Sequence, residues 1–291
     1  MKNENILCTS DWHFRKDTPI CRTDDFFETQ IKTLKQIRDI ALEHNAIIIH
    51  GGDIFHRARP RQAQILETYL FNIFKDCEII FIPGNHDLKN NNEQTIETTS
   101  DGVISKFENW TLLQKPTIKD CLFYFAKITD FNFGMFHKYC EKEKLPPFMN
   151  GIIAKDLLPT INNDYEIDLI VCGDNHHHFS LKLNNQTLIN PGCITRQTAN
   201  MKDYQPVVYL YNINTKETKT INLLDNDVNV VSVKHLTKQN ERDNRIDTYI
   251  NSLDKNMYIE LSFEDNIKDK IIKNKISKKI AEKIYLAMGV F

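Results

Sequence analysis

The chain has 291 residues, a formal net charge of −2, 41% hydrophobic residues and 26% charged residues. These values are ordinary for a globular protein with one large domain, or with one large domain and a small appendage. They exclude a polycationic chain, so any contact with nucleic acid must come from a local basic patch or from bound metal.

The cysteine pattern and the absence of long apolar runs suggest where the protein resides. The seven cysteines are odd in number and scattered, without a C-x-x-C pair. This argues for reduced thiols and against a disulfide scaffold or a zinc knuckle. The first residues lack an apolar signal region, and no apolar run approaches the length of a membrane span. A cytoplasmic protein without membrane association is therefore predicted, in the host cytoplasm if the chain is viral.

The first part of the chain alternates between predicted strands and helices. Strands are predicted at 5–9, 46–50 and 78–82, with helices over 24–44 and 61–75 between them. The apolar residues expected to face inward on the second helix are Ile65, Tyr69, Leu70 and Ile73. Strands that alternate with helices at this spacing are typical of a largely parallel sheet covered on both faces.

The rest of the chain changes in character. Residues 88–100 predict a polar loop that enters a helix, and further strands are predicted at 121–126, 131–136, 167–172, 187–189 and 206–211. Isoleucines near helical spacing among lysines predict a helix over 267–284, namely Ile271, Ile272, Ile276, Ile280 and Ile284. A large domain over 1–238 and a small helical segment over 239–291 are therefore expected.

Side chains that can bind metal follow five of the predicted strands. In chain order they are Asp11 and His13; Asp53; Asn85, His86 and Asp87; His137; and Asp174 and His176. Each one alone is more often a turn or capping residue, but chance rarely places such groups after five strands. The carboxyl ends of strands are where open α/β sheets bind ligands. A set of oxygen and nitrogen ligands without thiolate suits Mn²⁺, Fe²⁺, Zn²⁺ or Mg²⁺.

These motifs resemble, in the same order, the signature of the calcineurin-like metallophosphoesterases. The motifs are D-W-H, G-G-D-I-F-H, P-G-N-H-D, a single later histidine and a G-x-x-H element. The stretches S-D-W-H and G-G-D-I-F-H-R-A-R-P resemble the branch of double-strand-break repair nucleases typified by the SbcD subunit of bacterial SbcCD. The stretch N-P-G-C-I-T-R-Q, 190–197, resembles the element that follows the last ligand pair in that branch.

The resemblance implies a fold and an activity. The fold would be α/β, with a four-layer metallophosphoesterase core of mixed sheets flanked by helices and a small C-terminal capping segment. The activity would be a two-metal-dependent exonuclease or endonuclease that hydrolyses DNA phosphodiester bonds in recombination or double-strand-break repair. The expected partners are DNA, an SbcC-like ATPase subunit and a second copy of the chain. The expected cofactors are two divalent ions, with Mn²⁺ preferred and Mg²⁺, Fe²⁺ and Zn²⁺ as alternatives.

The resemblance also implies a role for each motif residue. One ion would be held by Asp11, His13, Asp53 and His176, and the other by Asp53, Asn85, His137 and Asp174. Asp53 would bridge the two ions. His86 would be the catalytic histidine beside the leaving oxygen, and Asp87 would orient it.

The last ligand pair leaves two alternatives. The family pattern is Gly-His-x-His, whereas this chain has Gly173-Asp174-Asn175-His176. If Gly173 at the strand end fixes the register, Asp174 replaces the first histidine and His176 is the second. The rival register uses His176 and His178 and needs a two-residue insertion. The glycine-anchored register is preferred here, because aspartate is a competent ligand for hard divalent ions.

Arginines that follow Asp53 are candidates for substrate binding. Arg57 and Arg59, with Arg61 as a further candidate, are predicted to contact DNA phosphates, each of which would add salt-dependent affinity. A solvated loop is the alternative for these residues. Two other functions remain open for the whole chain. One is hydrolysis of small phosphodiesters, nucleotides or phosphoproteins, and the other is an inactive scaffold on the same fold.

Overall fold

The structure, a computed structural model, describes residues 4–113, 123–128, 130–162, 167–224, 227–233 and 263–287. The chain divides into two compact units, Met1–Val233 and Lys234–Phe291. The expected boundary between 238 and 239 lies outside the described residues and stays a prediction.

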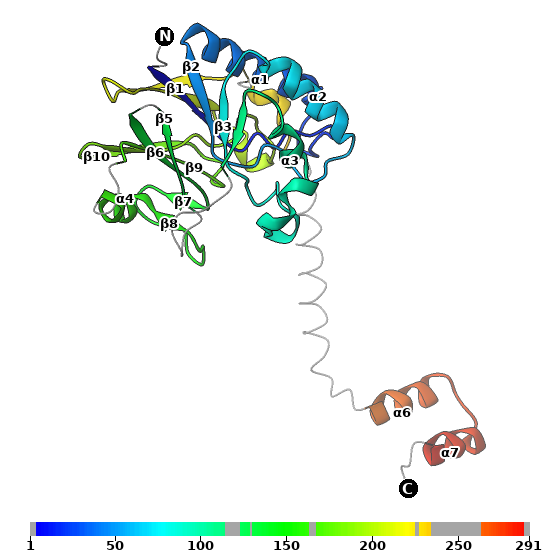
Figure 1. Cartoon of the computed structure of the whole chain (residues 1–291). Helices are drawn as coiled ribbons and strands as arrows, with labels where there is room; N and C mark the ends of the chain where they lie inside the picture. The colour runs from blue at the N-terminus through cyan, green and yellow to red at the C-terminus, as the bar shows by residue number, and fades with distance from the viewer. Residues whose placement is uncertain are drawn as a thin grey trace. The chain divides into compact units, whose positions relative to one another are not determined.

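The larger unit contains a first sheet of six strands in the order β13-β12-β1-β2-β3-β4 (Figure 1). Its parallel strands are β1 (Asn5–Thr9), β2 (Ala46–His50), β3 (Ile79–Phe81) and β4 (Trp110–Leu112). The antiparallel strands β12 (Val207–Asn212) and β13 (Thr218–Asn222) continue the sheet beside β1. The connections contain α1 (Phe26–Glu43), α2 (Ala63–Phe74), the 3-10 helices η1 (Lys89–Asn91) and η2 (Glu93–Thr98), and α3 (Ser100–Ile104). Strands β1 and β2 have the predicted bounds.

A second sheet has five strands in the order β10-β11-β9-β6-β5. They are β5 (Phe123–Ile128), β6 (Phe131–His137), β9 (Leu169–Gly173), β10 (Phe179–Leu183) and β11 (Gln186–Asn190). The three central strands β11, β9 and β6 run parallel, and the two edge strands run antiparallel to their neighbours. The remaining elements are the two-stranded pair β7 (Cys140–Glu141) and β8 (Ile152–Ile153), α4 (Ala154–Asn162), η3 (Ala199–Met201) and η4 (Val228–Val230). The prediction did not include β10 or α4.

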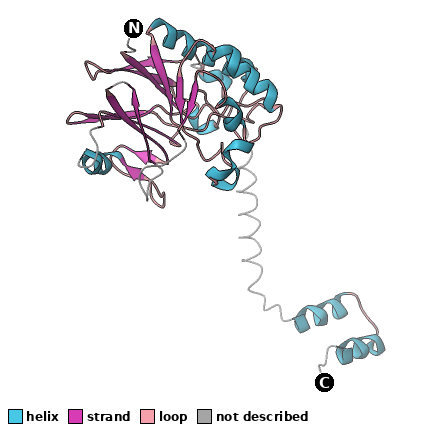
Figure 2. Cartoon of the chain, viewed as in Figure 1, coloured by secondary structure: helices cyan, strands magenta, loops and turns pink. Residues whose placement is uncertain are grey.

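Successive side chains of β1 point to opposite faces of the first sheet, and their contacts show the order of the layers. Ile6 and Cys8 point between the two sheets and pack with Met135 of β6, whereas Leu7 points to the opposite face and packs with Leu34 of α1. On the outer face of the second sheet, a third apolar cluster includes Leu158 of α4. The order is therefore helices, sheet, sheet, helix (Figure 2), which is the predicted four-layer α/β fold with mixed sheets.

The buried face of α2 differs from the prediction. Ile65 and Tyr69 are 44% and 39% exposed, so their predicted inward placement is wrong. The buried positions are Leu66, Leu70, Ile73 and Phe74. These follow the helical spacing i, i+4, i+7, i+8, which forms one continuous stripe. The predicted and the buried faces share Leu70 and Ile73, so the buried face is rotated about the helix axis by less than one residue, or less than about 100°.

The smaller unit contains two helices instead of the single predicted one. They are α6 (Phe263–Lys273) and α7 (Lys278–Ala287). Lys275 between them has a φ of 51°, the left-handed conformation that commonly ends a helix. Of the isoleucines predicted to form one face, Ile271 is buried, but Ile272 is 74% exposed.

Two further expectations concern the described residues. No helix among them is long and apolar enough to span a membrane. The six cysteines that the structure describes carry free, buried thiols, and Cys121 lies outside the described ranges. Burial raises the pKa of the Cys77 thiol to about 11. Such a thiol is a poor nucleophile and metal ligand, which agrees with a site built from oxygen and nitrogen.

Candidate metal centre

The loops after five strands meet at one place and are joined by backbone hydrogen bonds. The amides of Asp11 and His13, after β1, donate to the carbonyls of Gly52 and Asp53, after β2, at 2.9 Å each. The amide of Asp174, after β9, is 3.1 Å from Asp11 Oδ1. Because β6 and β9 are parallel neighbours and end at the same level, the second sheet delivers its polar residues to the same edge.

Four of the predicted ligands have an unusual backbone conformation. The φ angles are 50° for Asp11, 44° for His13, 61° for Asp53 and 84° for Asp174. Residues other than glycine rarely adopt positive φ, and each instance costs on the order of 1–3 kcal/mol unless the surroundings enforce it. Strain of this kind is concentrated at functional sites, so its presence in four residues of one cluster supports a site here.

Two glycines allow the loops to approach closely. Gly52 has a φ of 101°, and a Cβ atom there would overlap the ring of His137. A Cβ atom on Gly84 would overlap the carboxylate of Asp53. These residues were not among the predicted site residues, although the G-G-D and P-G-N-H-D motifs contain them. Their role is to let the backbone pass beside a packed ligand cluster.

One group of candidate ligands comes from β1 and from the loop after β9. His13 Nε2 and His176 Nε2 lie 3.0 Å apart. Asp11 Oδ1 is 3.9 Å from each of these two nitrogens. Atoms that bind one ion at about 2.0–2.2 Å are roughly 3–3.5 Å from one another, so the two imidazoles and the carboxylate fit a shared cation.

A second group surrounds Asp53. Asp53 Oδ2 lies 3.6 Å from His13 Nε2 on one side and 3.4 Å from His137 Nε2 on the other. His137 Nε2 is also 3.0 Å from Asn85 Oδ1 and 4.0 Å from Asp174 Oδ1. Asp53 is thus the residue between the two groups, where a bridging carboxylate would stand.

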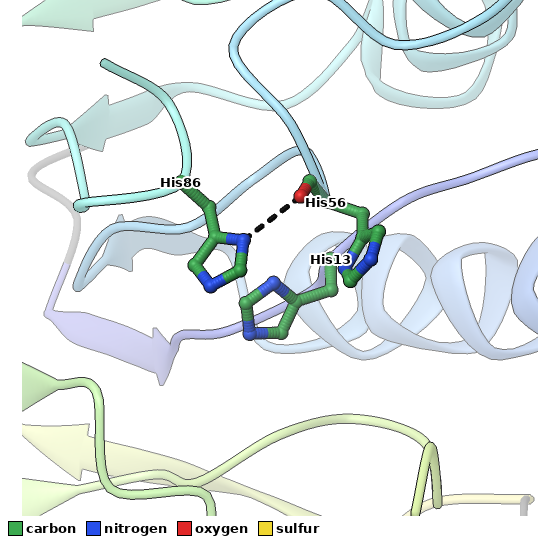
Figure 3. Close-up of side chains that lie close together, drawn as sticks. All are labelled: His13, His56 and His86. Carbon is green, nitrogen blue, oxygen red and sulfur yellow. Dashed lines mark hydrogen bonds between the residues drawn. The ribbon is translucent and has the colours of Figure 1, made fainter. Parts of the chain in front are cut away.

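The donor atoms fit hard or borderline divalent cations. Within Asp11, His13 and His176, and again within Asp11, Asp53 and His137, one ligand atom per residue lies within 4.8 Å of the others. The donors are carboxylate, imidazole and amide, which suit Mn²⁺, Fe²⁺, Zn²⁺ and Mg²⁺. A third group consists of three imidazoles, those of His13, His56 and His86 (Figure 3), and shares His13 with the first group.

The charges of the cluster are strongly interdependent. Burial raises the pKa of the Asp11 carboxyl to about 6. Burial also opposes ionisation of Asp53, but His137 and His13 outweigh it and hold the Asp53 pKa below its usual range. For His137, burial alone would lower the pKa, but the carboxylates of Asp53, Asp11 and Asp174 raise it to about 10. Without metal, the site therefore keeps a proton on His137.

Because His137 is protonated in the metal-free site, we expect metal affinity to rise with pH. A cation can use His137 only after that residue loses its proton, which has a pKa of about 10 in the metal-free site. Between about pH 6.5 and 8.5, each pH unit is therefore expected to strengthen Mn²⁺ binding about tenfold. Below about pH 6 the dependence steepens, because Asp11 also becomes protonated. Calorimetric titration with Mn²⁺ across this range measures the slope, and a pH-independent affinity would contradict the protonated state of His137.

His86 is held by the backbone beside the ligand cluster. Its Nδ1 lies 2.8 Å from the carbonyl oxygen of His56 (Figure 3), and its amide donates to Asp53 Oδ1 at 2.9 Å. Because a carbonyl only accepts, Nδ1 carries a proton and Nε2 is left for another partner. The ring of His86 lies 4.8 Å from the ring of His13, centroid to centroid, so it stands at the edge of the candidate metal centre.

Asp87 has contacts that differ from its predicted role. Its carboxylate accepts hydrogen bonds from the amides of Asp53, Ile54, Phe55 and Gly84, at 2.8–3.2 Å. The ring of His86 instead finds its acceptor in His56. Asp87 thus fastens the loop after β2 to the loop after β3, and the described contacts do not include an orienting bond to His86. Adjacent side chains in this turn point in different directions, which the linear sequence does not reveal.

A buried carboxyl group that the sequence did not single out lies behind Asp87. Asp101 on α3 is buried, and its carboxyl group lies within hydrogen-bond reach of the Asp87 carboxylate when one of the two carries a proton. Burial and the nearby Asp87 carboxylate raise the Asp101 pKa well above its usual value. A protonated Asp101 can share its proton with its neighbour, so it supports the loop anchor without adding a second negative charge.

The three consecutive histidines have different surroundings. His176 faces His13, as described, whereas His178 Nδ1 lies 2.8 Å from the hydroxyl of Tyr209. The ring of His177 packs against Tyr204 with a centroid distance of 5.3 Å. This arrangement favours the register anchored at Gly173, in which Asp174 and His176 are the candidate ligands.

A variant series tests this register. His176→Ala is expected to lower Mn²⁺ affinity and activity by more than about 100-fold, because a direct ligand is lost, whereas residues behind the ligands cost about 10–100-fold. His178→Ala is the matched control and is expected to cost less than His176→Ala. Asp174→His should retain metal binding and shift preference toward Zn²⁺. A silent Asp174→Ala together with a metal-free His178→Ala would establish the rival register.

The two predicted substrate-binding arginines are placed differently. Arg59 Nε donates to the carbonyl of Thr98 at 2.7 Å, so this side chain links the loop after β2 to η2. Arg57 is exposed, and within the described ranges its guanidinium has no hydrogen-bond or ion-pair partner. Both roles in substrate binding stay predictions, and Arg57 is the better placed of the two.

Comparison with known proteins shows which family has a matching sequence. The family model described as calcineurin-like phosphoesterase matches residues 4–178, which is more than half of the chain and contains every candidate ligand. Among curated proteins, the chain is 30% identical over 99 residues to the "Uncharacterized protein R555" of Acanthamoeba polyphaga mimivirus. That match covers 33% of this chain and only 7% of the relative.

Solved structures with a similar backbone include an archaeal phosphodiesterase and Vps29 proteins. The phosphodiesterase is 16% identical with a TM-score of 0.43, and the match covers 75% of this chain and 99% of that one. Vps29 of Cryptosporidium parvum is 16% identical with a TM-score of 0.36, covering 75% and 96%. TM-scores this low support no conclusion about activity. The family model, together with the cluster of strand-end ligands, shows that the chain belongs to the calcineurin-like phosphoesterase family.

Proposed function

We propose that this chain hydrolyses phosphodiester bonds of DNA with two divalent metal ions. Membership of the family supports metal-dependent hydrolysis of phosphoesters. The finer proposal concerns the substrate, the number of ions and the role of single residues. The resemblance of S-D-W-H and G-G-D-I-F-H-R-A-R-P to double-strand-break repair nucleases supports DNA as the substrate.

The observation that carries the two-ion proposal is the position of Asp53. Its Oδ2 stands between His13 Nε2 and His137 Nε2, at 3.6 and 3.4 Å, and each of these nitrogens belongs to a different ligand group. Asp11, His13, Asp53 and His176 would hold one ion, and Asp53, Asn85, His137 and Asp174 the other. When bound, two such ions supply Lewis-acid polarisation of the phosphate and make a water molecule more acidic.

His86 supplies the proton chemistry in this proposal. Its Nδ1 is committed to the His56 carbonyl, so Nε2 is the atom that can reach the substrate. Protonated His86 donates from Nε2 to the leaving oxygen of the cleaved strand, which avoids the release of an alkoxide. Asp87 and its four backbone contacts hold the loops after β2 and β3 together, and this fixes the position of His86 relative to Asp53.

The proposed partners follow from the same resemblance. An SbcC-like ATPase subunit and a second copy of this chain are proposed to assemble with it. The segment from 239 onward, which includes α6 and α7, is proposed to act as a reduced capping or partner-binding segment. Co-purification of the full chain and of a chain ending at 238 with an SbcC-like subunit tests this assignment.

A paired substrate assay tests the function. Metal-free protein is supplied with Mn²⁺ and incubated with a labelled linear duplex, and separately with bis(p-nitrophenyl) phosphate. The proposal predicts cleavage of both substrates and loss of both activities in EDTA. Cleavage of the small diester alone would favour the hydrolase of small phosphodiesters. Failure to cleave either substrate with both ions bound would favour the inactive scaffold.

A further inference from the structure

A basic pocket opens beside His56, next to the candidate metal centre. It has a volume of about 280 Å³, and four of the side chains that line it are cationic, namely Arg15, Lys16, Arg57 and Arg61. Asp17 is its one acidic lining residue. Four like charges around one hollow repel each other, and a bound anion would relieve that repulsion. Arg15 and Lys16 were not among the predicted site residues.

Arg15 is fixed in place at the wall of this pocket. Its backbone amide and carbonyl are both bonded to the side chain of Gln30 on α1, at 3.2 and 2.9 Å. Its guanidinium contacts Asp17 and donates to His56 Nε2 at 2.9 Å. The side chain is only 13% exposed, so the charge is held on a rigid framework. Such preorganisation lowers the entropy cost of binding an anion.

The other cations are available in different ways. Lys16 Nζ lies over the ring of Phe27, 3.5 Å from its centroid, which restricts the side chain. Arg57 and Arg61 are exposed, and their guanidinium groups have no hydrogen-bond or ion-pair partner among the residues that the structure describes. The guanidinium groups of Arg57 and Arg61 are therefore available to phosphate oxygens, which a guanidinium can bind in a bidentate manner.

Two buried nitrogens at this wall also lack partners. His56 Nδ1 and Arg15 Nε are buried and have no hydrogen-bond partner in the described part of the chain. A buried polar group without a partner is costly, on the order of 1–3 kcal/mol. An anion bound in the pocket would bring hydrogen-bond acceptors to this wall. They are a second, independent sign of a ligand at this place.

His56 connects the pocket with the chemistry. Its Nε2 accepts from Arg15, and its carbonyl oxygen accepts from His86. The rings of His56 and His86 are stacked, with centroids 5.5 Å apart (Figure 3). We propose that this pocket binds the phosphate next to the scissile one on the same DNA strand, so that the enzyme prefers a chain of phosphodiesters to a single small diester. The inference rests on the proposed nuclease function.

The test uses a double variant and a matched control. Arg57→Gln/Arg61→Gln removes two exposed charges from the pocket. Arg38→Gln removes one partly exposed charge on α1 that is paired with Asp39 and does not line the pocket. For each protein, kcat/KM is measured with Mn²⁺ on a short oligothymidylate and on bis(p-nitrophenyl) phosphate. The ratio of the two values is expected to fall at least about tenfold in the double variant, since two charge-assisted contacts are lost, and to stay unchanged in Arg38→Gln.

A binding arm makes the test independent of catalysis. Binding of a fluorescent oligothymidylate is measured in EDTA across salt concentrations. Because the pocket takes one phosphate, loss of its neutralisation should reduce the slope of log K against log salt by up to about 0.7, the value per neutralised phosphate of a single strand. A wild-type protein that cleaves neither substrate would remove the proposed function, and this arm would still decide whether the pocket binds DNA. An unchanged slope and an unchanged ratio in the double variant would overturn the proposal.

Discussion

His86→Ala is expected to lower kcat for phosphodiester hydrolysis by about 10²–10⁴-fold, the usual contribution of a positioned general acid. The ring is not among the proposed metal ligands, and its Nδ1 is bonded to the His56 carbonyl. Removal of the ring should therefore take away the proton donor and leave the ligand cluster in place. Mn²⁺ content, determined by elemental analysis of the dialysed protein, should stay at two ions per chain.

A leaving-group series separates this role from a structural one. A substrate whose leaving group is a weak base, such as p-nitrophenolate, needs little help from a general acid. The defect of His86→Ala should accordingly be smaller on bis(p-nitrophenyl) phosphate than on an oligonucleotide. Near-normal turnover of the oligonucleotide would remove His86 from the mechanism.

Asp53→Ala is expected to abolish activity by removing both ions. Its Oδ2 lies between the two ligand groups, 3.6 Å from His13 Nε2 and 3.4 Å from His137 Nε2. Loss of a shared carboxylate leaves each group with one ligand fewer and with less negative charge. This carboxylate also holds the pKa of His137 high. Its removal would leave His13 and His137 on either side of the vacated position.

Metal analysis decides this prediction. At a Mn²⁺ concentration of about ten times the Kd of the unmodified protein, the variant should contain fewer than about 0.2 ions per chain, since loss of a direct ligand is expected to cost more than the roughly 100-fold upper limit for residues behind the ligands. Asp39→Ala, which removes an exposed carboxylate on α1, is the matched control and should bind two ions. Two ions per chain in Asp53→Ala would show that Asp53 does not bridge them.

Part of this architecture could be predicted from the sequence because buried parallel strands are apolar runs that stop abruptly. The run Ala46–His50 is buried throughout, and the polar residues begin where the strand ends. The same rule located the candidate ligands after β1, β3, β6 and β9. The register after β9 could be argued from Gly173, because a Cβ atom there would overlap the carbonyl of Gly51 and the ring of His137. That glycine position is fixed by packing between the two sheets.

Other features depend on contacts that a linear pattern does not contain. The buried face of α2 was misplaced because Ile65 and Leu66 are equally apolar, and only the sheet beneath decides which is covered. The acceptor for His86 is a backbone carbonyl of His56, 30 residues away in the chain, and not the neighbouring Asp87. Asp101 has no motif around it, and its importance arises only from burial beside Asp87.

The most direct test of the account is metal-dependent cleavage of DNA by the metal-free protein. Mn²⁺ is titrated into the protein with a labelled linear duplex present, and the cleavage rate and the number of bound ions are measured in the same samples. The account predicts that the rate follows occupancy of the second ion and stays near background with one. Full occupancy by two ions without cleavage of the duplex, or full cleavage with a single ion, would contradict it.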